Sequence, residues 1–190
     1  MKPSTYTGQL GLVLLLDRST AEEMILNASG HHIPHVTLYH SKLRGVPQKT
    51  VRELLTELAG ALPIPLAFTK IAPFGGKFLF WDIERSAALM RAHERALGLS
   101  RYFVPTGTQQ AEREGIVLSA NERRNVQTYG HPLVRELWRP HVTLGYFPHG
   151  LSCDTAMKPF NGSAHGIAFV RIGEAGTIAK IISQKNARCN

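Results

Sequence analysis

Two histidine–threonine pairs carry the residue types and spacing that suggest chemistry. The pentapeptide Pro-His-Val-Thr-Leu occurs at residues 34–38 and again at residues 140–144. A proline followed by valine and leucine is ordinary sequence for the start of a strand. That composition does not explain why a histidine and a threonine occupy the same two positions twice.

Strand geometry gives these residues a shared direction. Side chains alternate between the two faces of a strand, so His35 shares a face with Thr37, and His141 with Thr143. A neutral imidazole takes a proton from a nucleophile, a protonated one gives a proton to a leaving group, and both forms coexist near neutral pH. Threonine hydroxyls hydrogen-bond phosphate oxygens as charge grows on them. Two such pairs facing one cleft predict metal-independent cleavage of a phosphodiester, with the base and acid roles left open.

The elements that position these pairs alternate between strand and helix patterns. Strands are predicted at residues 10–17, 35–43, 64–72, 77–84, 141–147, 167–172 and 178–183. Helices are predicted at residues 19–29, 47–62 and 86–97, the first capped by Ser19 or Thr20 and the last ended by Gly98. Residues 73–76 predict a hairpin turn, and residues 178–183 close a terminal hairpin. The order indicates a mixed α+β domain, and neither a Gly-x-Gly-x-x-Gly sequence nor a P-loop is present.

The long connection at residues 99–140 is harder to assign. It holds charged clusters, a short apolar run at 116–118 and one or two helical turns at 133–138. A connection of this length in a small domain is functional or contains further elements. We expect it to act as a lid or a substrate-reading loop.

Paired His-x-Thr-x motifs in opposite halves of a chain of this size resemble those of the 2H phosphoesterase superfamily. Its members include 2′-5′ RNA ligase-like proteins and phosphodiesterases that act on 2′,3′-cyclic phosphate ends. The second motif, His-Val-Thr-Leu-Gly at 141–145, is similar to the cyclic nucleotide phosphodiesterase branch. The element order fits the family across nearly the whole chain. The resemblance implies one domain over 1–190, an α+β fold with two pseudo-symmetric lobes of antiparallel sheet around a central basic cleft, and helices on the outside.

The resemblance also implies roles for the matched residues. His35 and His141 would be the catalytic pair, and Thr37 and Thr143 would bind the phosphate. The implied activity is hydrolysis of a 2′,3′-cyclic phosphate, or of a 2′-5′ linkage, on an RNA end or a small nucleotide, with no cofactor. The alternative is a catalytically idle module that binds RNA or a nucleotide with the same fold.

Aromatic residues follow both motifs. By strict alternation Tyr39 lies on the face of the first pair and Phe147 on the face of the second, where either would stack on a nucleobase. Ordinary packing at the rim of the cleft is the competing interpretation. Tyr146 has the opposite parity and is predicted to be core, unless a bulge intervenes.

Two further clusters have a functional and a bland interpretation. Arg123, Arg124, Arg135 and Arg139 precede the second motif and would contact phosphates of an oligonucleotide, although such a run is more often a solvated face. His31 and His32 with His35 and His40 form a histidine-rich patch. Neither Cys nor a carboxylate joins that patch at ligand spacing, so it favours loop histidines over a metal site.

Composition sets the remaining bounds. The 190 residues carry a formal charge of +8, with 43% hydrophobic and 19% charged residues. This excludes a disordered or fibrous chain and favours an anionic ligand. Cys153 and Cys189 build no disulfide framework, which indicates a reducing compartment. The apolar run at 10–16 is too short for a secretory signal or a membrane span. We therefore expect a cytoplasmic monomer that does not enter a membrane.

Overall fold

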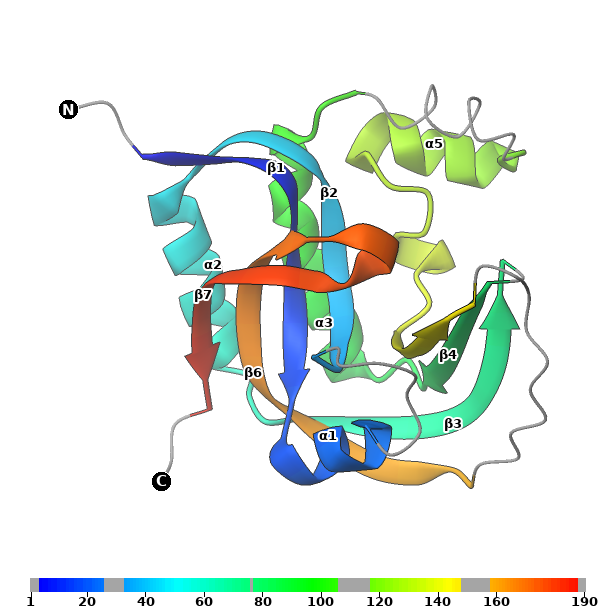
Figure 1. Ribbon diagram of the computed structural model, residues 1–190. Coiled ribbons are helices and arrows are strands. Elements are labelled where there is room, and N and C mark those ends of the chain that lie inside the picture. The colour runs from blue at the N-terminus through cyan, green and yellow to red at the C-terminus, as the bar shows by residue number, and fades with distance from the viewer. Residues whose placement is uncertain (1–3, 26–32, 76, 106–116, 148–157, 188–190) are drawn as a thin grey trace.

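The computed structural model describes residues 4–25, 33–75, 77–105, 117–147 and 158–187 (Figure 1). Its strands are β1 (Thr5–Leu16), β2 (His35–Pro47), β3 (Ile64–Phe74), β4 (Phe78–Ile83), β5 (His141–Tyr146), β6 (Phe160–Ile172) and β7 (Ile178–Asn186). Its helices are α1 (Arg18–Ile25), α2 (Gln48–Ala59), α3 (Ala87–Ala96) and α5 (Ala120–Tyr129), with short 3₁₀ helices η1 (Leu97–Tyr102), η2 (Arg135–Leu137) and η3 (Glu174–Gly176). Within these ranges no helix has the length and apolar character to cross a membrane.

The strands form one open antiparallel sheet in the order β2-β1-β6-β3-β4-β5, with β7 added beside β6. The long strand β6 joins its two halves, because its first part pairs with β3 and its later part pairs with β1. The two predicted lobes are therefore the two halves of a single sheet. Helices lie on the outside of the sheet (Figure 1). The α+β architecture is confirmed.

The two motif strands sit at opposite ends of the sheet order, yet β2 and β5 contact each other. Twist accumulates across a sheet of many strands, and here it brings the two end strands together. The repeated pentapeptides, far apart in the sequence, therefore face one another in space.

Both motif strands carry a β-bulge at the same motif position. In β2, Thr37 and Tyr39 pair with neighbouring residues of β1, and Leu38 between them has no partner there. In β5, Leu144 is left without a partner in β4 in the same way. An extra residue reverses the alternation of faces. Beyond each bulge, the face of the His–Thr pair therefore continues at His40 and at Tyr146. Tyr146 is accordingly 40% exposed and not core, because the bulge that the sequence analysis named as the exception is present.

The main core lies between the sheet and the helices that cover it. Helix α2 contributes Val51, Leu55 and Leu58. Helix α3 contributes Leu89, Ala92 and Ala96, together with the buried His93. Each large apolar side chain buried in this way stabilises the fold by roughly 1.5–3 kcal/mol.

Several helix ends differ from the sequence prediction; α2, for example, ends at Ala59 and not at residue 62. Asp17 caps α1 in place of Ser19 or Thr20, because its carboxylate accepts hydrogen bonds from the backbone N–H and the hydroxyl of Thr20. Burial alone would raise the Asp17 pKa, but hydrogen bonds from Ser163, Thr20 and Ser19 outweigh it and hold the pKa far below its usual value. Gly98 does not end α3, since the chain continues directly into η1.

The unpredicted elements include the first half of β6 and the helix α5. The first half of β6 contains Gly162, which weakens the strand pattern, yet a Cβ there would lie 2.5 Å from the Thr20 hydroxyl oxygen, so close contact with α1 requires glycine. Helix α5 falls in the charged segment before the second motif. Its capping box was readable from the sequence, because Ser119 and Glu122 have the required spacing and exchange both hydrogen bonds.

Candidate functional site

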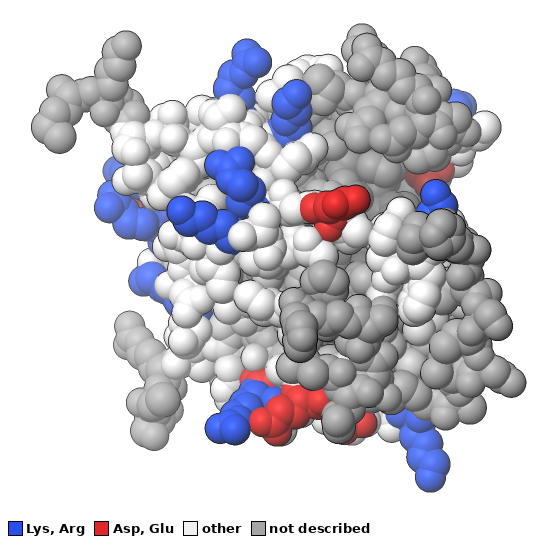
Figure 2. Space-filling view, viewed as in Figure 1, with Lys and Arg blue, Asp and Glu red and all other residues white. Residues whose placement is uncertain are grey.

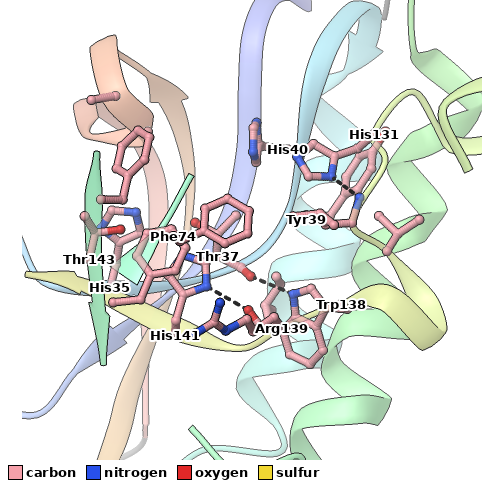
Figure 3. A pocket seen from close by; sticks show the side chains of 17 residues that line it. His35, Thr37, Tyr39, His40, Phe74, His131, Trp138, Arg139, His141 and Thr143 are labelled. Atoms are coloured by element: carbon pink, nitrogen blue, oxygen red, sulfur yellow. Dashed lines mark hydrogen bonds between the residues drawn. The ribbon is translucent and has the colours of Figure 1, made fainter. Parts of the chain in front are cut away.

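A cavity of about 300 Å³ lies between the motif strands and is lined by all four motif residues, His35, Thr37, His141 and Thr143 (Figure 3). Its volume is at the lower end of the range for small-molecule sites. The structure thus brings together the two pairs that the sequence singled out. Each motif strand begins at its histidine, directly after the proline, so both strands begin beside this cavity. Val36 and Val142 point to the opposite faces and are buried.

Both motif histidines are oriented by the same hydrogen bond. His35 Nδ1 lies 2.8 Å from the carbonyl oxygen of Ile33, and His141 Nδ1 lies 2.7 Å from that of Arg139. A carbonyl oxygen only accepts, so Nδ1 carries the proton in each ring. The nitrogen that exchanges a proton with a ligand is then Nε2 in both.

Aromatic stacking fixes the plane of the second motif histidine. The His141 ring lies parallel to Phe80, with ring centres 3.7 Å apart and an interplanar angle of 17°. Phe80 in turn stacks on Phe74 at 4.9 Å and 18°. Strands β3 and β4 therefore supply one wall of the cavity, which the sequence pattern did not reveal.

An ion pair stands beside His141. The Arg139 guanidinium donates from Nε and Nη2 to the two carboxylate oxygens of Asp82, at 2.7 and 2.8 Å. This is the bidentate geometry in which arginine binds a carboxylate most firmly. Asp82 is nearly buried, on β4, and Arg139 lines the cavity.

Burial is the main cause of a lowered pKa at His141, which falls to about 4. The positive charge of Arg139 and the nearby His35 lower it further. The hydrogen bond to the Arg139 carbonyl oxygen and the negative charge of Asp82 act in the opposite direction and compensate only in part. His141 is therefore neutral at neutral pH.

The bulge in β2 is held by two side chains from outside the sheet. Trp138 Nε1 donates to the carbonyl oxygen of Thr37 at 3.2 Å, and His93 Nδ1 donates to that of Leu38 at 2.6 Å. The other nitrogen of His93 accepts from the Arg135 backbone N–H at 2.9 Å. Because Nε2 accepts a hydrogen bond, the ring is neutral and uses both nitrogens, and burial lowers the His93 pKa in the same direction. No spacing in the sequence connects these residues to the motif.

The predicted aromatic residues have different positions. Tyr39 is buried and lines the cavity with its ring, while its hydroxyl donates to the carbonyl oxygen of Tyr129 at 2.6 Å. Phe147 does not line the cavity; it is partly buried against the main core. Tyr146 packs against Phe78, which is a lining residue, with ring centres 4.9 Å apart.

Of the four arginines before the second motif, Arg139 alone lines the cavity. Arg123 and Arg124 are exposed on α5. Arg135 forms ion pairs with Glu94 and Glu136. The solvated-face interpretation describes these three better than a phosphate site does. Figure 2 shows Lys and Arg side chains spread over one face of the molecule.

The long connection at 99–140 contributes a wall of the cavity through Leu133, Val134 and Trp138. Residues 106–116 of this connection, including part of the predicted apolar run, lie outside the described residues. So do His31, His32, Cys153 and Cys189. Among the residues that the structure describes, no group of three or more His, Cys, Asp or Glu is arranged to hold a metal ion.

Two lining features were missed entirely. His131 lines the cavity beside His40, and the two rings meet edge to face with centres 4.5 Å apart. Ala175 and Gly176, in the turn of the terminal hairpin between β6 and β7, also line the cavity. Both features come from loop segments whose place over the motif strands depends on the whole fold.

Comparison with known proteins agrees with the family resemblance of the two motifs. A family model described as the 2′-5′ RNA ligase superfamily matches residues 23–170, more than half of the chain. The crystal structure of TT0787 of Thermus thermophilus superposes with a TM-score of 0.58 at 16% identity, covering 95% of this chain and 98% of that one. E. coli LigT in apo form gives a TM-score of 0.51 at 13% identity, covering 97% and 99%. No curated protein matches the chain closely enough to count as a relative.

Proposed function

This chain belongs to the 2′-5′ RNA ligase superfamily, within the phosphoester-processing 2H phosphoesterases, and we propose that it is a metal-independent phosphodiesterase. Its substrate is a 2′,3′-cyclic phosphate on an RNA end or a small nucleotide, or a 2′-5′ linkage. One observation carries the proposal. His35 and His141 line a single cavity, each with Nδ1 bonded to a backbone carbonyl oxygen and each with its threonine beside it.

The reaction needs a nucleophile activated on one side of the phosphorus and a leaving group protonated on the other. One imidazole takes a proton from water as the water oxygen forms a bond to phosphorus. The other gives a proton to the 3′ ribose oxygen as its bond to phosphorus breaks, which leaves a 2′-phosphate. Thr37 and Thr143 donate hydrogen bonds to the non-bridging oxygens, whose charge grows in the transition state.

The environment of His141 favours the role of general base. Its lowered pKa keeps the ring neutral at neutral pH, so Nε2 has a lone pair ready to accept a proton. The stack on Phe80 holds the ring in place, so little reorganisation is needed at the moment of attack. His35 then takes the role of general acid.

Structures of a similar fold support a nucleotide as the ligand. E. coli LigT has been crystallised with 3′-AMP and with ATP, and these structures match the chain with TM-scores of 0.50 and 0.51 at 12% identity. LigT has also been crystallised with phosphate, at a TM-score of 0.50. The basic net charge of this chain agrees with an anionic substrate.

The test is hydrolysis of a 2′,3′-cyclic nucleotide in excess chelator, with chromatography separating the 2′- from the 3′-phosphate product. We expect wild type to produce the 2′-phosphate, and His35→Ala and His141→Ala each to reduce turnover about 10³-fold. His165→Ala is the matched control, because His165 is an exposed histidine on β6 outside the cavity. It should behave as wild type.

Two other results would change the assignment. Turnover that appears only with an added divalent metal would contradict the two-histidine mechanism. Tight binding of the cyclic nucleotide without turnover, together with no cleavage of a 2′-5′ dinucleotide, would identify an idle binding module.

A further inference from the structure

The cavity continues past the motif residues to a second pair of imidazoles, His40 and His131. Their rings meet edge to face, with centres 4.5 Å apart and an interplanar angle of 66°. His40 follows the bulge in β2 and so continues the face of His35 and Thr37. His131 comes from the segment between α5 and η2. Figure 3 shows His131 and Tyr39 on one side of the cavity and His141 and Thr143 on the other.

We propose that His40 and His131 form a subsite for the nucleobase of the substrate, adjoining the place where the phosphate is held. The inference rests on the proposed function and names the part of the nucleotide that this end of the cavity recognises.

A hydrogen bond fixes which nitrogen of His131 can donate. Its Nδ1 accepts from the backbone N–H of Leu133 at 3.1 Å. In the neutral ring the proton is therefore on Nε2, which becomes a donor. Nucleobases present ring nitrogens and carbonyl oxygens as acceptors along their edges. Such an edge matches the donor of His131.

The surroundings of the imidazole pair suit a flat, weakly polar group. Leu133 and Val134 line this end of the cavity, and Tyr39 adds the surface of its ring. The Tyr39 hydroxyl is already bonded to the Tyr129 carbonyl oxygen. An apolar recess with a few placed polar atoms is the usual form of a small-molecule site.

Charge distinguishes a nucleobase from a second phosphate as the occupant. Burial, with smaller contributions from His35 and His141, lowers the pKa of His40 to about 4. Burial also holds the pKa of His131 well below its usual value. Both rings are neutral at neutral pH. Arg139, the cation that lines the described cavity, is engaged by Asp82. A subsite without charge suits a neutral nucleobase. A second phosphate bound there would be a dianion with no positive charge beside it among the described lining residues.

The subsite lies close enough to the motif residues for one nucleotide to reach both. His40 lines the same cavity as His35 and His141, and its ring contacts that of His131 directly. It therefore links the two ends of the cavity. A phosphate at Thr37 and Thr143 and a base at His131 can belong to a single ligand.

The test is titration calorimetry at pH 7.5 with two probes, adenosine 2′-monophosphate and inorganic phosphate. Wild type is expected to bind the nucleotide at least tenfold more tightly than phosphate. His131→Phe keeps a flat ring and removes the donor, so it should weaken nucleotide binding about tenfold and leave phosphate binding unchanged. His131→Gln, which retains a donor, should recover part of that loss. His40→Phe provides a second, independent substitution, and His165→Phe is the control outside the cavity.

Equal weakening of both probes in the His131 and His40 variants would overturn the subsite, and so would a wild type that binds the nucleotide no more tightly than phosphate. In either case the phosphate site and the proposed function would stand. Absence of binding of both probes to wild type would instead contradict the proposed function itself.

Discussion

The imidazole of His93 lies flat against the indole of Trp138, with ring centres 4.2 Å apart and an interplanar angle of 5°. The two rings donate hydrogen bonds to consecutive carbonyl oxygens of β2, those of Thr37 and Leu38. These carbonyls belong to the first motif at its bulge. The stacked pair therefore fixes the backbone from which the Thr37 side chain projects.

Replacing Trp138 with Phe tests this support. The variant keeps a ring on His93 but loses the donor to Thr37, so we expect a loss of about 1 kcal/mol in the free energy of unfolding. If the pair positions the motif, kcat also falls severalfold while KM changes little. Urea denaturation and steady-state kinetics measure the two effects. Leu58→Ala, a core change in α2, is the control that destabilises the protein without changing kcat. An unchanged kcat in Trp138→Phe would show that the pair is only structural.

The hydroxyls of Thr37 and Thr143 are expected to stabilise the transition state by hydrogen bonds to the phosphate. Thr37→Val and Thr143→Val keep the shape of each side chain and remove one donor to the phosphate, so each should reduce kcat/KM for a 2′,3′-cyclic nucleotide about a hundredfold. Thr128→Val, at an exposed position on α5, should have no effect. A change below twofold in both motif variants would contradict the phosphate-binding role.

The pH dependence of kcat/KM reports the general base of the free enzyme. Because His141 must be neutral to act, activity should persist as the pH falls and decline only near its pKa of about 4. Arg139→Gln removes a charge that lowers this pKa and leaves Asp82, which raises it, so the acid limb should move toward neutral pH. If kcat/KM of wild type already declined near pH 6.5, His141 would not be the base. The same conclusion would follow if Arg139→Gln did not shift the pH at which kcat/KM declines.

Histidines that the fold holds neutral make stability depend on pH. His40, His93, His131 and His141 all have lowered pKa values in the folded protein, mainly because of burial. Below the ordinary pKa of 6.5 the unfolded chain binds more protons than the folded chain, so stability falls as the pH drops toward about 4. Above pH 7 these histidines do not make the free energy of unfolding depend on pH.

Urea denaturation at several pH values between 7.5 and 4.5 checks this expectation. His131→Phe removes one of the four groups and should reduce the slope by up to about 1.4 kcal/mol per pH unit. Asp17 interferes little, because its lowered pKa begins to affect stability only below about pH 5, at the acid end of this range. A wild-type stability that is constant over this range would contradict the burial of neutral imidazoles.

Much of the framework could be predicted because its signals are local. Apolar spacing indicated α2, and β3 pairs with β4 as the predicted hairpin, although Pro73 and Phe74 belong to β3 and not to the turn. The repeated pentapeptide indicated both motif strands and the face shared by each histidine and its threonine. Strict alternation then failed beyond the bulges, so that His40 and Tyr146 continue the faces of the two pairs. A bulge depends on how a strand pairs with its neighbour, and nothing within Leu38 or Leu144 reveals it.

The repeated five-residue pattern was enough to single out His35 with Thr37 and His141 with Thr143, the residues that we propose carry the chemistry. The tertiary structure alone decided what surrounds them. Curvature of the sheet brought the two end strands together. Packing then placed Phe80, Arg139 and the His40–His131 pair around the cavity. Burial and charge at each imidazole depend on such neighbours, which lie far away along the chain, so no local pattern could supply them.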